Sequence, residues 1–450
     1  MKKMTLLLTL LLCGLANAFG QWTTIDLSNY RWQITSTPIG SKVYFAGGAN
    51  PTVNLSLVQV YDTETGQWES ANMSVPRRFA NSVSSGSKLF IAGGFNNAGQ
   101  TMNVVDIYDT LTKQWTVAQL SQARFAISMV SKDSVVLFAG GGDFSVAPIK
   151  AYDVVDIYHT QSNSWTTEKL SLARAGMGST VAGNKAFFAG GEINSGAVTD
   201  RVDIYNFSTD SWSVATLSAP RFLIGVATVG NKVLFAGGVD SDGIPTKRVD
   251  VYNLDSKSWS IDSLSVARGF SPDENVASLC GKAYFIGGLN LDPIVGTFSE
   301  DFHEIDIYDG ESGTWSVDQL PYDLCSHSVS SIGNQILVAG GATIVGSNYQ
   351  LRNKVSIFTD ANCMVGTHTP IAQADFFQVF PNPTSGDVTV VLEGVSQADF
   401  RLFDAMGRIL RQGQWSDESN TLNTAQLEPG IYRLQLVTKG VYANQLIVVQ

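Results

Sequence analysis

Ionisable side chains are scarce in this chain of 450 residues. Only 15% of the residues are charged, and the sequence contains four histidines and four cysteines. Catalytic and metal centres need several titratable or metal-binding side chains in one place. A sequence with so few of them has little from which to build such a centre, and we expect neither a cofactor nor a bound metal.

Basic residues and long apolar segments are also few. Lysine and arginine number 29 against 40 acidic residues, which leaves a formal net charge of −11. An acidic protein without a basic patch is a poor partner for nucleic acid or an anionic membrane. Beyond the N-terminus, glycine or polar residues interrupt every apolar run within about 10 positions, so we expect no membrane span.

The N-terminus has the pattern of a secretory signal peptide. Lys2 and Lys3 supply a positive start, residues 4–12 are apolar, and residues 16–18 are small. We therefore predict a signal peptide over residues 1–18 and a mature chain that begins at Phe19. Cys13 does not indicate a lipoprotein, because Leu12 precedes it where a small residue is needed.

A repeat of about 46 to 53 residues dominates the chain up to residue 360, in the range of a four-stranded propeller blade. Each copy has an apolar strand that ends in a glycine pair, and then a strand with alternating apolar residues. In most copies a tyrosine in this second strand precedes a tryptophan by seven residues, and an arginine follows nine residues later. The glycine pairs end at Gly48, Gly94, Gly141, Gly191, Gly238, Gly288 and Gly341.

The last copy of the repeat lacks its tryptophan, whereas Trp22 stands near the mature N-terminus with Arg31 nine residues beyond it. Residues 22–27 are therefore predicted to supply the missing outer strand of the last blade. Such a strand closes the ring and removes the exposed sheet edges of an open array. The prediction is an all-β fold with a seven-bladed β-propeller over residues 19–360, followed by a linker at 361–374.

The glycine pair, tyrosine, tryptophan and arginine at these spacings resemble the kelch repeat. The resemblance covers residues 21–360 and implies a propeller that binds a protein or a carbohydrate through one face. Kelch-type propellers include a copper radical oxidase and sialic-acid epimerases, so an extracellular carbohydrate-active enzyme is the alternative. A purely structural role in a surface layer is a third hypothesis.

Residues 375–450 form a second unit of alternating strands, which predicts a small β-sandwich of immunoglobulin type. The segments 380–383, 404–408, 427–432 and 446–449 resemble the C-terminal sorting domain of the type IX secretion system, with Gln445 where the family usually has lysine. The resemblance implies export through the periplasm and the outer membrane, removal of this domain, and release or attachment at the cell surface.

Candidate ligand-binding residues come from the segments that vary between blades. The residue after each repeated arginine differs from copy to copy, and the loops between the second and third strands vary in length on the same face. Variation on a constant frame suits recognition, although sequence drift without function predicts the same pattern. The candidates are Trp32, Arg78, Phe125, Phe222, His303, His327 and Arg352 in a monomeric protein.

Two possible cation sites have simpler explanations. His303 and His327 approach one face of the ring and, with Cys325, have the chemistry of a metal site, but buried structural histidine and cysteine are far commoner. The segment 240–243 starts like a calcium loop but lacks the later acidic ligands. We expect a polar loop there.

Comparing the copies predicts buried ion pairs within the blades. Five arginines begin blades whose third strands carry an aspartate nine residues before the tryptophan, and the last copy has lost both, with Leu324 and Ser356 in their places. Arg31 faces Gln59 in the first copy. The predicted pairs are Arg77 with Asp106, Arg124 with Asp156, Arg174 with Asp203, Arg221 with Asp250, and Arg268 with Asp306.

Three cysteines remain after removal of the signal peptide, and this odd number allows one disulfide within the chain. Cys280 ends the inner strand of the sixth blade and Cys363 follows the third strand of the seventh, so both emerge on the same face. We predict that these two are neighbours and able to bond. Cys325 is predicted to be a free, buried thiol.

Overall fold

The computed structural model describes residues 21–143, 149–271, 275–291, 298–346, 348–360, 363, 377–392, 397–403, 409–425, 427–438 and 441–450. The chain divides into two compact units, residues 1–365 and residues 366–450. The predicted signal peptide lies outside the described residues. Of the predicted linker, only Cys363 is described.

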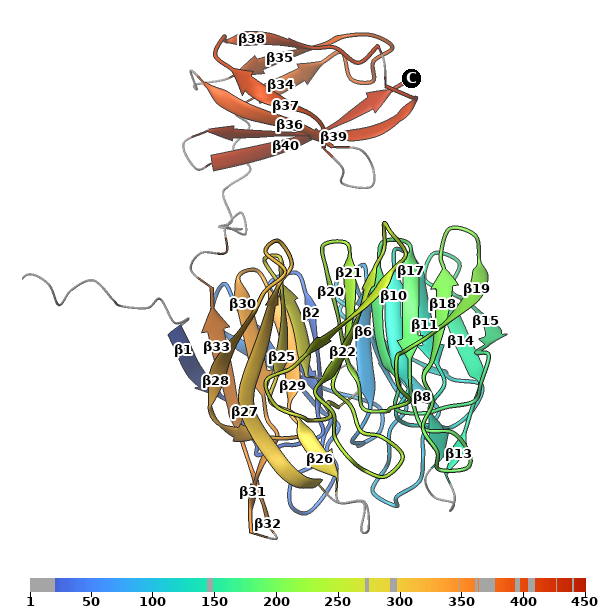
Figure 1. The fold of residues 1–450 in the computed structure, drawn as a ribbon. Coiled ribbons are helices and arrows are strands. Elements are labelled where there is room, and N and C mark those ends of the chain that lie inside the picture. Colours follow the sequence, from blue (N-terminus) through green and yellow to red (C-terminus); the bar gives the residue numbers. More distant parts are fainter. Residues whose placement is uncertain are drawn as a thin grey trace, which may run out of the picture. The chain divides into compact units, whose positions relative to one another are not determined.

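Seven sheets of the first unit share one antiparallel four-strand order (Figure 1). The first and second contain β2 (Thr35–Ile39), β3 (Lys42–Ala46), β4 (Leu57–Asp62) and β5 (Trp68–Asn72), then β6 (Asn81–Ser85), β7 (Lys88–Ala92), β8 (Val104–Asp109) and β9 (Gln114–Gln119). The third and fourth contain β10 (Ser128–Lys132), β11 (Val135–Ala139), β14 (Val154–His159) and β15 (Ser164–Lys169), then β16 (Gly178–Ala182), β17 (Lys185–Ala189), β18 (Arg201–Asn206) and β19 (Ser211–Thr216).

The fifth sheet contains β20 (Gly225–Val229), β21 (Lys232–Ala236), β22 (Arg248–Asn253) and β23 (Trp259–Ser263). The sixth contains β24 (Val276–Leu279), β25 (Lys282–Ile286), β27 (Phe298–Asp309) and β28 (Trp315–Leu324), with β26 (Leu289–Leu291) paired to the long β27. The seventh contains β29 (Ser328–Ile332), β30 (Gln335–Ala339), β33 (Lys354–Thr359) and β1 (Gln21–Asp26).

The innermost strands contact one another in a closed circle, in the order β2, β6, β10, β16, β20, β24, β29 and back to β2. The outer hairpins are held by aromatic pairs, because the antiparallel register sets each tyrosine opposite the tryptophan of the next strand. The ring centroids of these six pairs, from Tyr61 with Trp68 to Tyr308 with Trp315, lie 4.8 to 5.0 Å apart. The all-β propeller is the fold that the repeat predicts.

The ring is closed by the N-terminal strand. β1 pairs antiparallel with β33, so that Trp22 lies opposite Phe358 and their rings are 5.5 Å apart. Figure 1 shows the dark blue β1 beside the orange β33, at opposite ends of the propeller sequence. The predicted exchange of the last outer strand is confirmed.

A disulfide joins Cys280 and Cys363, whose Cα atoms are 5.6 Å apart. It connects the β24–β25 hairpin of the sixth sheet to the chain just after β33 of the seventh. Cys325 is a free thiol and is fully buried, so all three cysteine predictions are confirmed. Burial raises the pKa of the Cys325 thiol to about 12, which keeps it protonated and unreactive.

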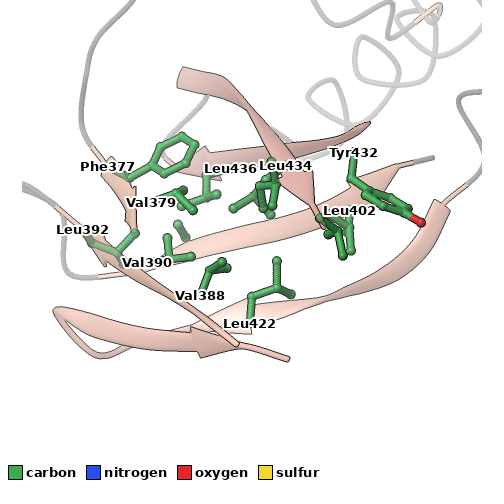
Figure 2. Packing of buried hydrophobic residues seen from close by; sticks show 13 residues of the cluster. Phe377, Val379, Val388, Val390, Leu392, Leu402, Leu422, Tyr432, Leu434 and Leu436 are labelled. Atoms are coloured by element: carbon green, nitrogen blue, oxygen red, sulfur yellow. The ribbon is translucent and has the colours of Figure 1, made fainter. Parts of the chain in front are cut away.

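The second unit is a β-sandwich. One sheet contains β34 (Phe377–Phe380), β35 (Val388–Leu392) and β38 (Ser419–Leu422), and the other contains β37 (Ile409–Trp415), β36 (Ala398–Phe403), β39 (Gly430–Thr438) and β40 (Val441–Val449). Alternate apolar residues of both sheets meet in one core, where Val388, Val390 and Leu434 are completely buried (Figure 2). Residues 404–408 of the sorting-domain resemblance lie outside the described residues. In the described part of the chain, no helix is long and apolar enough to cross a membrane.

Candidate functional site

Buried arginines lie where six of the seven blades begin, and five of them form the predicted ion pairs. Arg77 lies 2.7 Å from Asp106, Arg174 2.7 Å from Asp203, Arg221 2.6 Å from Asp250 and Arg268 2.8 Å from Asp306, and Arg124 pairs with Asp156. Each of these side chains is at least 96% buried. The ion-pair prediction is confirmed, and these guanidinium groups are occupied within the frame.

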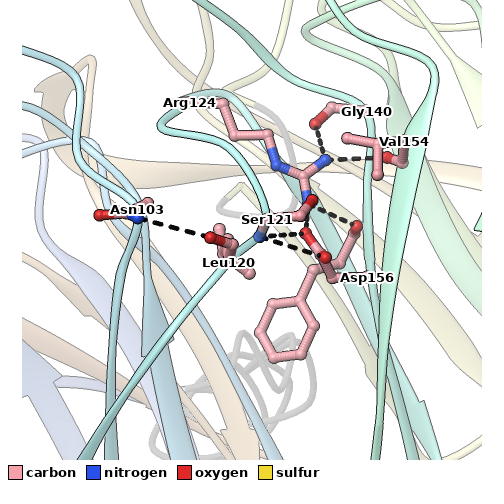
Figure 3. Close-up of polar contacts among 8 residues, drawn as sticks. Asn103, Leu120, Ser121, Arg124, Gly140, Val154 and Asp156 are labelled. Carbon is pink, nitrogen blue, oxygen red and sulfur yellow. Dashed lines mark hydrogen bonds and ion pairs between the residues drawn. The ribbon is translucent and has the colours of Figure 1, made fainter. Parts of the chain in front are cut away.

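Figure 3 shows how Arg124 is held. Its guanidinium donates to the carbonyl oxygens of Gly140 at 2.7 Å and Val154 at 2.8 Å in addition to the Asp156 carboxylate. Burial lowers the pKa of Arg124 to about 10, which still leaves it charged at neutral pH. The aspartate also accepts the backbone N–H of Ser121, in the connection from the preceding blade. The pair thereby fastens two neighbouring blades, a role that sequence comparison did not reveal.

The glycine pairs leave the arginines room. A Cβ on Gly288 would stand 2.9 Å from Cδ of Arg268, and the φ of Gly288 is +141°. In the first blade, Arg31 donates to the side-chain oxygen of Gln59 at 2.8 Å. The seventh blade, which lacks both charges, instead has a hydrogen bond of 2.9 Å between the hydroxyls of Tyr322 and Ser356.

Isolated β-bridges join the residue after each arginine to the residue after a glycine pair. We call the end of the propeller that carries these bridges the loop face. Four of the sequence candidates lie on this face and form such bridges: Trp32 with Ala49, Arg78 with Phe95, Phe125 with Gly142, and Phe222 with Val239. The arginine-bearing segments and the variable loops therefore share one face, as predicted.

The loop face is uneven because the sixth and seventh sheets carry extra strands there. β26 pairs with the extended start of β27, and β31 (Ala342–Val345) and β32 (Asn348–Leu351) form a hairpin. In the third sheet, β12 (Gly142–Asp143) and β13 (Lys150–Ala151) form a shorter one. Figure 1 shows β13, β26 and the β31–β32 hairpin along the same edge of the propeller.

A second ring of residues, one position further along, defines the inner rim of the loop face. Most have left-handed backbone, with φ between 50° and 66°, a conformation that is uncommon outside glycine. Their backbone groups bond from blade to blade, for example Phe79 N–H to the Gln33 carbonyl and Leu223 N–H to the Gly176 carbonyl, both at 3.3 Å. Among these residues, only Gly176 is of a type that indicates left-handed backbone from the sequence. The left-handed residues are Gln33, Phe79, Ala126, Gly176, Leu223 and Ser326.

Half-buried aromatic rings gather on one side of the loop face. Phe95 and Phe125 have ring centroids 4.2 Å apart, and Phe79 lies 6.3 and 6.1 Å from them. The Arg78 guanidinium lies 5.9 Å from the centre of the Phe79 ring. Trp32 packs at 5.0 Å against Tyr349 of the β31–β32 hairpin. We call Phe79, Phe95 and Phe125 the phenylalanine cluster.

The three remaining candidates lie in different surroundings. His303 is partly exposed and hydrogen-bonds Asp323 at 2.5 Å, which raises the pKa of this histidine. Arg352 donates to the Thr343 hydroxyl at 2.8 and 3.0 Å, and its guanidinium lies 4.9 Å from the centre of the Tyr322 ring. His327 is completely buried, which removes it from any surface at which a ligand binds.

The polar side chains of the two possible cation sites have partners within the frame. His303 and His327 bond different partners, and Cys325 donates to the Ala342 carbonyl at 3.4 Å. The carboxylate of Asp240 accepts the N–H groups of Asp242 and Ile244, both at 2.9 Å, as in a self-bonded polar loop. Within the described residues, no group of three or more metal-binding side chains converges.

His327 predicts acid sensitivity of the fold. Its Nε2 lies 3.1 Å from the Ile286 carbonyl, and burial lowers the pKa of the imidazole to about 4. Below the unfolded value of 6.5, only the unfolded chain binds this proton, so stability is complete above that pH and declines toward pH 4. The fall amounts to about 3 kcal/mol in the free energy of unfolding.

Denaturant unfolding at pH 7 and pH 4.5 measures this decline. His327→Met introduces the side chain that Met177 has at the same position of the fourth blade, and it is expected to reduce the difference between the two pH values. The matched control is His159→Gln, at an imidazole that bonds the exposed Thr166 hydroxyl. Equal acid sensitivity in His327→Met and the unmodified protein contradicts the assignment.

Models of known protein families match a region in each of the two units. The KLHDC2/KLHL20/DRC7 Kelch-repeats domain matches residues 33–221, and the Kelch motif matches residues 220–261. The secretion system C-terminal sorting domain matches residues 378–450, a tail that indicates type IX secretion to the cell surface or the extracellular space. No curated protein matches the chain. The chain is a secreted kelch-repeat protein that ends in a type IX C-terminal sorting domain.

Proposed function

We propose that the propeller binds a protein or carbohydrate ligand through the loop face. The observation that carries this proposal is the phenylalanine cluster, whose half-buried rings stand beside Arg78 on a frame fixed by buried ion pairs. Aromatic residues and arginine supply much of the binding energy in recognition sites because they contribute a large contact area with little loss of conformational freedom. Phe222 and Trp32 extend the same face, and Arg352 and His303 lie toward its sixth and seventh sheets.

The second unit accounts for how this binding module reaches its ligand. We infer that residues 1–18 direct the chain to the periplasm and that the sorting domain, within residues 375–450, then directs it across the outer membrane. The mature propeller, from Phe19 to about residue 360, acts as a monomer at the cell surface or beyond it. No step of this route requires catalysis by the propeller.

Ligand arrays test the proposal. The chain without residues 1–18 is applied to protein and glycan arrays, and any partner is measured by titration. Phe125→Ala is expected to weaken binding about tenfold or more, as truncation of an interface aromatic does. Leu111→Ala is the control, since Leu111 is 81% exposed in the β8–β9 turn at the opposite end of the sheets.

Thermal unfolding of each variant distinguishes lost contact from lost fold. A partner that binds Phe125→Ala as well as the unmodified chain, or that is lost equally in Leu111→Ala, contradicts recognition by the loop face.

A further inference from the structure

One position in the second strand of each blade holds a phenylalanine in most sheets and a smaller residue in two. In five sheets this position holds a phenylalanine whose ring lies 5.3 to 6.0 Å from the tryptophan of the same sheet. The second sheet has Ile91 there and the seventh has Val338. These two sheets therefore lack the ring that fills the space beside Trp115 and Trp22. The five phenylalanines are Phe45, Phe138, Phe188, Phe235 and Phe285.

A cavity lies next to the apolar cluster of each of these two residues: Ile91 packs with Tyr44 and Trp115, and Val338 with Tyr284 and Phe358. The one between the sixth and seventh sheets is only about 10 Å3, because Tyr284 and Phe358 close on Trp22. The one between the first and second sheets is about 320 Å3 and is lined by Tyr44, Tyr108 and Trp115. This volume falls at the lower end of the range for small-molecule sites, roughly 300 to 1,000 Å3.

The larger cavity is separate from the loop face. It includes the β2–β3 turn from Ile39 to Lys42 and residues Thr110 and Lys113 of the β8–β9 turn. These turns stand at the opposite end of the strands from the glycine pairs. The loop-face cluster and this cavity therefore have no residue in common.

The polar groups of the cavity are of both signs and differ from those of the third and fourth blades. Lys42 and Glu69 form an ion pair of 2.7 Å, and the Glu69 side chain is 66% exposed. In the third and fourth blades, the tyrosine hydroxyl donates to Asn163 or Asp210 at 2.8 Å. The second blade has Lys113 at that position, which offers no acceptor to Tyr108.

A neutral sugar ring matches this combination. Its hydroxyls donate to the Glu69 carboxylate and accept from Lys42 or Lys113, and its C–H face packs on aromatic rings such as Trp115. Glu69 pairs with Lys42 and so supplies an acceptor beside a donor, and a purely apolar ligand leaves this ion pair unsolvated. The geometry points to a second binding site, for a neutral mono- or disaccharide, between the first and second sheets, next to the apolar cluster in which Ile91 stands where five other sheets hold phenylalanine.

Saturation-transfer NMR tests this site on the chain without residues 1–18. The probes are glucose, galactose, mannose, N-acetylglucosamine, maltose and cellobiose, and we expect signal transfer to at least one of them. Ile91→Phe restores the side chain that five other blades hold and is expected to abolish the transfer. Val338→Phe is the matched control, because it fills the corresponding place in the seventh sheet and leaves the larger cavity unchanged.

Two further variants make the outcome decisive. Glu69→Ala changes an exposed side chain, so the fold is retained, and we expect affinity for the sugar to fall about tenfold with the loss of a charged acceptor. Phe125→Ala on the loop face is expected to leave the transfer unchanged. Absence of transfer from every probe overturns the inference. So does transfer that persists in Ile91→Phe and Glu69→Ala, or that disappears only in Phe125→Ala.

Discussion

Asp156→Ala is expected to lower the free energy of unfolding by about 3 to 5 kcal/mol, because it leaves Arg124 charged and buried without its partner. Arg124 is completely buried, and its remaining partners are backbone carbonyl oxygens. The same change also removes the acceptor for the Ser121 N–H, so the connection between two blades is loosened. Urea unfolding followed by tryptophan fluorescence measures the loss.

The seventh blade provides the control for this experiment. It folds with Leu324 and Ser356 in place of the charged pair, so the double variant Arg124→Leu with Asp156→Ser removes both charges together. We expect it to be more stable than Asp156→Ala, since no unpaired charge remains in the core. Asp153→Ala breaks the exposed pair with Lys169 in the same sheet and is expected to cost at most about 1 kcal/mol. A single variant no less stable than the double one refutes the stranded-charge explanation.

Deletion of residues 21–26 is expected to destabilise the entire propeller unit by more than about 3 kcal/mol. β33 then becomes an exposed edge, and Phe358 loses the Trp22 ring. Truncation of a fully buried tryptophan costs roughly 3 to 5 kcal/mol. Trp22 is partly buried, but the deletion removes a whole paired strand along with it. Thermal unfolding is the measurement.

Complementation separates a structural effect of β1 from damage elsewhere. A synthetic peptide of residues 19–30, added to the deletion variant, is expected to restore stability in proportion to its concentration. The same peptide with Trp22→Ala is expected to restore less. Unchanged unfolding of the deletion variant shows that the ring does not depend on this strand.

Comparison of the repeats predicted those contacts that every blade makes in the same way. The pairing of Arg77 with Asp106 was readable because both residues recur together and are lost together at Leu324 and Ser356. The role of β1 as the outer strand of the seventh blade followed from the tryptophan that the last repeat lacks and from Trp22 near the N-terminus. The disulfide between Cys280 and Cys363 followed from the ends of strands, since antiparallel order decides the face on which each end emerges.

Contacts that only one blade makes escaped this reasoning. The burial of His327, the hydrogen bond between Tyr322 and Ser356, and the phenylalanine cluster depend on neighbours about one repeat away in sequence. The left-handed residues such as Phe79 escaped for a different reason. Their φ is imposed by backbone bonds to the adjacent blade, and phenylalanine itself carries no preference for that conformation.

The sequence by itself determined the fold class, the blade frame, the closing strand and the sorting domain, because each depends on local alternation or on spacing repeated along the chain. Only the tertiary structure decided which variable side chains meet. Ile91 is an ordinary apolar residue in its own strand. Only the structure shows that it packs with Tyr44 and Trp115, two residues that line the cavity, because packing depends on side chains from two blades.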